Sequence, residues 1–75
     1  MKPRYLTESE LSGMASAACA SYEFACDWRA AGEAAAEYAA DELGARATSA
    51  QVATAVRLAQ TQWEGYRMEA RHAST

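Results

Sequence analysis

Few side chains in this sequence could carry out acid–base, nucleophilic or metal chemistry. A proton shuttle needs a positioned base with an orienting partner, and the single histidine, His72, has no such partner beside it. A zinc site needs three or four ligands, of which Cys19, Cys26 and Asp27 supply only part. No Glu-x-x-His motif of a di-iron bundle occurs, and the four glycines are scattered rather than gathered in a phosphate-binding loop. We therefore expect no catalytic residue, no metal ion, no cofactor and no enzymatic activity.

The two cysteines are seven residues apart. On one helix, their Cα atoms would lie about 10 Å apart, which is too far for a disulfide between them. We expect two packed, reduced thiols, with an intermolecular bridge or a reactive thiol as the alternatives. The start MKPRYLTESE has no apolar signal-peptide core, and no apolar run approaches membrane-spanning length. We expect a cytoplasmic protein without a membrane segment.

The composition favours helix and limits the core. Seventy-five residues predict one domain, 1–75. Twenty of the hydrophobic residues are alanine, the best helix former, whereas Leu, Ile, Val and Phe together number seven. An alanine core buries little apolar area per residue, so a chain this short is close to marginal as a monomer. We expect an all-α protein that is completed by another chain.

Local signals predict where the helices begin and end. Thr7 and Glu10 have the spacing of a capping box, and so do Thr48 and Gln51. Gly44 predicts a helix end, because glycine tolerates the left-handed conformation found there. The expected order is a flexible lead-in 1–6, helix about 8–43, loop 44–48, helix about 49–72 and a flexible tail 73–75. The fold class is therefore an antiparallel hairpin of unequal helices.

An apolar seam runs along each predicted helix. At 100° per residue, the apolar positions of the first helix share one arc, and those of the second follow a 4-3-4-3-4 spacing typical of an antiparallel coil. Gly32 lies inside the first arc as either a hinge or a site of close backbone approach, and its small neighbours favour close approach. The expected dimer or core seam is Leu11, Met14, Tyr22, Trp28, Val52, Val56, Trp63 and Tyr66.

The unequal lengths leave part of the first helix uncovered. Positions 8–42 carry eight acids and one base, whereas positions 46–71 carry four arginines and two glutamates, which favours antiparallel docking of the two helices. The overhang would carry Leu11, Met14 and Ala18. Either the first helix breaks near Gly32 and folds back into a three-helix arrangement, or two hairpins pair into a four-helix bundle. We favour the homodimer.

An acidic face lies opposite the apolar arc of the first helix. Its carboxylates repel each other at i,i+4 spacing, whereas mixed signs would stabilise the helix better. Two aromatic residues beside them point away from the seam, and exposed aromatic side chains are common in binding surfaces. A merely solvated charged face is the alternative. The expected site for a basic protein surface is Glu23, Phe24, Asp27, Glu33, Glu37, Tyr38 and Asp41.

Direct nucleic-acid binding is not expected from a chain of net charge −3, although Arg57, Arg67 and Arg71 form a basic flank on the second helix. A small DNA-binding transcriptional regulator that uses this helix is one alternative. A structural subunit of a larger helical assembly is another. The nearly apolar start of the second helix, at residues 50–53, disfavours the DNA-reading alternative.

Two resemblances bear on function. Trp63-Glu64-Gly65 is similar to the W-x-G motif of a small secreted helical-hairpin family, but that motif lies between the helices, whereas here it falls within the second helix. In size, acidity and lack of catalytic equipment, the chain resembles the small phage proteins that inhibit host machinery, anti-CRISPR proteins among them, although no motif carries this likeness. We expect a non-enzymatic protein–protein interaction module, a small inhibitor or an adaptor.

Overall fold

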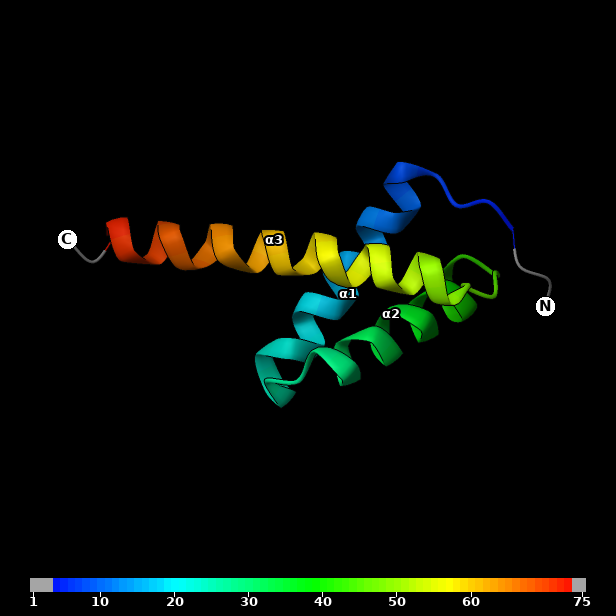
Figure 1. Ribbon diagram of the computed structural model, residues 1–75, viewed down its shortest axis with the longest axis horizontal. Helices are drawn as coiled ribbons and strands as arrows, with labels where there is room; N and C mark the ends of the chain where they lie inside the picture. The colour runs from blue at the N-terminus through cyan, green and yellow to red at the C-terminus, as the bar shows by residue number, and fades with distance from the viewer. Residues whose placement is uncertain (1–3, 74–75) are drawn as a thin grey trace.

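The protein is built from three helices. The computed structural model describes the backbone of residues 4–73 and the side chains of residues 4–66. The helices are α1 (Glu8–Ala25), α2 (Trp28–Glu42) and α3 (Ser49–Ala73), and residues 4–73 contain no strand. Figure 1 shows α1 and α2 meeting at a corner, with α3 lying across both and its C-terminal half projecting beyond them. The all-α prediction is confirmed, in its three-helix form.

The predicted helix boundaries at residues 7 and 48 are confirmed. The backbone N–H of Glu10 donates to Thr7 Oγ1 over 3.2 Å, and the N–H of Thr7 donates to the Glu10 carboxylate over 2.9 Å. Thr48 and Gln51 repeat this reciprocal arrangement at the start of α3, over 3.1 and 2.8 Å. Gly44, with φ of 60°, follows the end of α2 as expected.

The predicted continuous helix 8–43 is wrong, because the chain turns at Cys26 and Asp27 rather than near Gly32. Cys26 ends α1 in the left-handed region, with φ of 53°, and its N–H donates to the carbonyl of Tyr22 over 2.8 Å. The Asp27 carboxylate caps α2 by accepting the N–H of Arg29 over 3.0 Å. The negative charge of Asp27 is stabilised at this position at a helix N-terminus. In a continuous helix, Asp27 would instead repel Glu23.

Gly32 is a site of close helix approach, as the sequence favoured. It is buried within α2, where a Cβ atom would lie 3.4 Å from Val52 Cγ1 and 3.5 Å from Val56 Cγ2. The missing side chain therefore lets the backbone of α2 approach α3. No hinge is present at this position.

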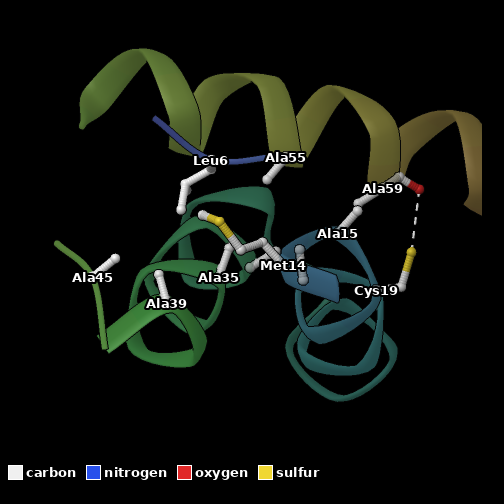
Figure 2. Close-up of a cluster of buried hydrophobic side chains, with 11 residues drawn as sticks. Leu6, Met14, Ala15, Cys19, Ala35, Ala39, Ala45, Ala55 and Ala59 are labelled. Carbon is white, nitrogen blue, oxygen red and sulfur yellow. Dashed lines mark hydrogen bonds between the residues drawn. The ribbon is translucent and has the colours of Figure 1, made fainter. Parts of the chain in front are cut away.

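The core is made of small side chains around one methionine. Met14 is completely buried and points from α1 toward Leu6 and Ala35 (Figure 2). Leu6, from the lead-in for which we expected flexibility, is only 3% exposed. The remaining buried hydrophobic residues are Ala15, Ala18, Cys19, Ala31, Ala35, Ala39, Ala45, Ala55 and Ala59. Because alanine occupies little space, the three helix backbones approach each other closely.

The fold-back covers the segment that was expected to overhang. Met14 and Ala18 are fully buried, and Leu11 is half-buried against the core. The predicted overhang is therefore wrong, because α2 returns along α1 instead of extending it. The segment that projects is the C-terminal half of α3 (Figure 1), where Tyr66 is 60% exposed rather than packed in the seam.

Three seam aromatics form a cluster beside the corner. The rings of Tyr22 and Trp28 are stacked, with centroids 3.8 Å apart and planes at 11°. Trp63 of α3 meets Tyr22 edge-on, with centroids 5.1 Å apart. Two further seam residues, Val52 and Val56, are half-buried. This cluster joins all three helices.

Arg4 connects the lead-in to three helix ends. Its guanidinium donates to the Glu10 carboxylate over 2.8 and 3.3 Å, and to the carbonyl of Leu43 over 3.1 Å. The Gln51 side chain donates to the Arg4 carbonyl over 2.7 Å. These bonds connect the start of α1, the end of α2 and the start of α3. None of the described helices is long and apolar enough to cross a membrane.

Candidate functional site

We define the acidic α2 face as Glu33, Glu37 and Asp41, which lie together on the surface of α2. All three side chains are exposed on α2 at four-residue spacing, which places them in a row about 12 Å long. None of these carboxylates has a hydrogen bond or ion pair with another described side chain. Arg29 is exposed at the N-terminal end of the same row. The row is therefore available to an external cation.

The break between α1 and α2 separates the other predicted site residues from this face. Glu23 and Phe24 lie in the last two turns of α1, and Phe24 is 92% exposed, as expected. Asp27 is exposed, but its carboxylate is engaged in capping α2. The predicted acidic stripe along one long helix is thus two separate sets on two helices.

Tyr38 does not stand free beside the acids. Its side chain is half-buried against the core and lies over Gly13 of α1. A Cβ atom at Gly13 would come within 2.6 Å of the Tyr38 hydroxyl oxygen. The expectation of an exposed Tyr38 is wrong, because the fold-back places α1 against the flank of α2 that a single long helix would have left in water.

A groove between α1 and α3 was not foreseen from the sequence. It has a volume of about 250 Å³ and is open to solvent. Its walls are formed by Ser16, Cys19, Ala20 and Glu23 of α1 and by Gln62 and Tyr66 of α3. No local pattern joins these residues, because their proximity depends on how α3 crosses α1.

Cys19 lines this groove, and its surroundings make its thiol unreactive. Its thiol donates to the carbonyl of Ala59 over 3.3 Å and lies 3.7 Å from Gln62 Oε1. Burial raises the pKa of the Cys19 thiol, and the negative charge of Glu23 raises it further. Cys26, in contrast, is an exposed free thiol. The expectation of two packed cysteines therefore holds for Cys19 alone.

The remaining chemistry of the described residues is sparse. No group of three or more His, Cys, Asp or Glu side chains that could hold a metal ion occurs among them. Arg57, the first residue of the predicted basic flank, is exposed. The side chains of Arg67, Arg71 and His72 lie outside the described part of the chain.

Comparison with known proteins assigns no function to the chain, so we infer its function from these surfaces. No protein-family model, no curated protein and no solved structure matches the chain. The two surfaces that remain are the acidic α2 face and the groove between α1 and α3.

Proposed function

We propose that this chain is a non-enzymatic protein-binding module whose acidic α2 face docks on a basic surface of another protein. The observation that carries the proposal is the row of Glu33, Glu37 and Asp41, which is exposed on one face and makes no hydrogen bond or ion pair with another described side chain. Like charges at this spacing weaken a helix by a few tenths of a kcal/mol per pair. A basic partner surface would relieve that repulsion and steer the encounter.

Phe24 supports a binding role from the corner next to α2. A phenylalanine that is 92% exposed contributes nothing to the core and exposes apolar surface to water. Aromatic side chains are enriched in the buried centres of protein interfaces. We therefore include Phe24 in the proposed interface, as an apolar contact beside the acidic row.

The proposed mode of action is occupation of the partner's surface. An inhibitor or adaptor of this kind, of the phage or anti-CRISPR type, needs no catalytic group, only a complementary face. We place this activity in the cytoplasm, because both cysteines are free thiols and reducing compartments keep thiols in that state.

A homodimer is part of the proposal. The C-terminal half of α3 projects beyond α1 and α2 (Figure 1), and Leu58 and Tyr66 on this helix are 37% and 60% exposed. Pairing of two chains along α3 would cover Leu58 and would form an assembly of six helices in place of the expected four-helix bundle. Sedimentation equilibrium tests this directly. We expect a mass that rises toward twice 8.1 kDa with concentration, and a constant monomer mass would contradict it.

Capture of the partner from lysate of the source cells tests the acidic α2 face. Neutralising it with Glu33→Gln, Glu37→Gln and Asp41→Asn raises the net charge by three. A matched control, Ser12→Lys, Ala53→Lys and Gln60→Lys, makes the same change at exposed positions on α1 and α3. We expect the neutralised chain to lose the partner and the control to retain it, with unchanged helical circular dichroism in both.

Equal retention by the two variants would contradict the proposal. Retention of duplex DNA instead of protein, weakening steeply with salt, would favour the regulator that uses α3. A chain that stays partly unfolded until a larger partner is added would favour the structural subunit.

A further inference from the structure

The groove between α1 and α3 has the size of a site for one side chain. Sites for small molecules and cofactors usually enclose about 300–1,000 Å³, whereas this groove encloses about 250 Å³ and is open on one side. Its volume therefore lies below the usual range for such sites. A single long side chain from another molecule fits the space.

The polar side chains that line the groove, Ser16, Glu23, Gln62 and Tyr66, can all accept hydrogen bonds, and Glu23 carries the negative charge among them. Glu23 contributes a carboxylate, and Gln62 contributes an amide oxygen that already faces the Cys19 thiol. The Cys19 hydrogen is engaged by the carbonyl of Ala59, so it is not available to an anion. None of the lining residues within the part of the chain whose side chains are described is basic. The Glu23 carboxylate, which only accepts hydrogen bonds, therefore favours a ligand that donates them.

The negative charge and the aromatic wall of the groove further restrict the class of ligand that it can bind. The negative potential of Glu23 reaches the base of the groove, since it contributes to the raised pKa of Cys19. Tyr66 forms a wall with its side chain 60% exposed, and aromatic faces attract cations within about 6 Å. Guanidinium combines a planar set of donors that matches carboxylate oxygens with a surface that stacks on aromatic rings.

We propose that this groove is an anchor site for an arginine side chain of the partner, held by Glu23, Gln62 and Tyr66. The inference rests on the proposed function, because it names the contact by which a basic partner would be fixed. The groove is lined by residues of α1 and α3, whereas Glu33, Glu37 and Asp41 lie on α2. The two surfaces can therefore be tested separately.

Titration with a small probe tests the groove on the intact chain. The probe is N-acetyl-arginine N-methylamide, and its matched control is the citrulline analogue, which is neutral and nearly isosteric. Backbone amide shifts are followed by NMR at a concentration where sedimentation gives a single species. We expect saturable shifts at residues 16–23 and 62–66, with a dissociation constant on the order of millimolar, and at least about fivefold weaker binding of the citrulline analogue.

Two variants assign the interaction to its residues. Glu23→Gln removes the charge and keeps the shape, and should weaken the arginine probe about tenfold. Tyr66→Leu removes the aromatic face and should weaken it about two- to fivefold. Glu37→Gln, on the acidic α2 face, is the matched control and should bind the probe as the unmodified chain does.

The proposal is overturned if the shifts lie elsewhere, if the citrulline analogue binds equally, or if Glu23→Gln leaves binding unchanged. Any of these results, together with partner capture that still depends on Glu33, Glu37 and Asp41, removes the groove and leaves the proposed function standing.

Discussion

The ring of Tyr22 stacks on the ring of Trp28 across the break between α1 and α2, with centroids 3.8 Å apart. The two residues belong to different helices, so the stack holds the corner rather than a continuous helix. Trp63 meets the same tyrosine edge-on, which ties the corner to α3. In a core composed mainly of alanine, these rings supply much of the large apolar surface.

The stack should therefore be a main source of stability. We expect Trp28→Leu to lower the free energy of unfolding by about 2 kcal/mol, and Tyr22→Leu to act similarly. The double variant should lose less than the sum, with a coupling of about 0.5–1.5 kcal/mol. Urea unfolding followed by circular dichroism measures each value. Additive losses would show that the stack contributes no specific energy.

Cys26 should be a position where glycine stabilises the fold. Its φ of 53° is unfavourable for a residue with a Cβ atom, and its side chain is exposed. We expect Cys26→Gly to raise the free energy of unfolding by about 0.5–1 kcal/mol. Cys26→Ala is the matched control, because it removes the thiol and keeps the Cβ atom, and it should give no such gain.

Two glycines in helices should respond oppositely to alanine. Gly65 of α3 has open space around it, so Gly65→Ala should stabilise the protein by about 0.5–1 kcal/mol through helix propensity. At Gly13 the new Cβ atom would meet the Tyr38 ring, and the cost of displacing that ring should cancel or exceed the gain. Thermal unfolding of both variants measures the contrast. If the ring is responsible, Gly13→Ala should become stabilising in a Tyr38→Ala background.

The Arg4–Glu10 contact should make stability depend on acid pH. The bond from Arg4, followed by the bond from the Thr7 N–H, lowers the pKa of Glu10 to about 2. A carboxyl group that is more acidic in the folded state stabilises the fold above its unfolded pKa of about 4.3. This contribution is lost as the pH falls from about 4.3 to about 2.

Glu10→Gln isolates that contribution, because the amide oxygen can still accept the Thr7 N–H. We expect this variant to be less stable than the unmodified chain at pH 7 and equal to it near pH 2, as measured by urea unfolding at each pH. In an Arg4→Gln background, the difference at pH 7 should shrink. A difference that stays constant from pH 7 to pH 2 would exclude the ionised Glu10 as its source.

The helix ends were predictable from sequence because their signals are local. Thr7 with Glu10, and Thr48 with Gln51, satisfy backbone groups within four residues, so spacing alone identifies them. Gly44 is recognisable because its backbone conformation favours one residue type. The periodicity that placed Met14 on the buried face is equally local.

The corner escaped prediction because its signals are weak and incomplete. Asp27 is a good capping residue, but no acid or glutamine follows it at the third helical position, and the left-handed residue before it is a cysteine rather than a glycine. Without the corner, the contact of Tyr38 with Gly13 and the groove beside Cys19 could not be foreseen. Both depend on how whole helices pack rather than on neighbouring residues.

Site-specific photocrosslinking tests most directly whether the acidic α2 face contacts the partner. A benzoyl-phenylalanine is placed at position 37, in the middle of that face, or at exposed position 60 of α3, and each chain is irradiated with its captured partner. We expect crosslinks from position 37 that map to a lysine- and arginine-rich surface of the partner, and none from position 60. Crosslinks from position 60 alone would contradict the account.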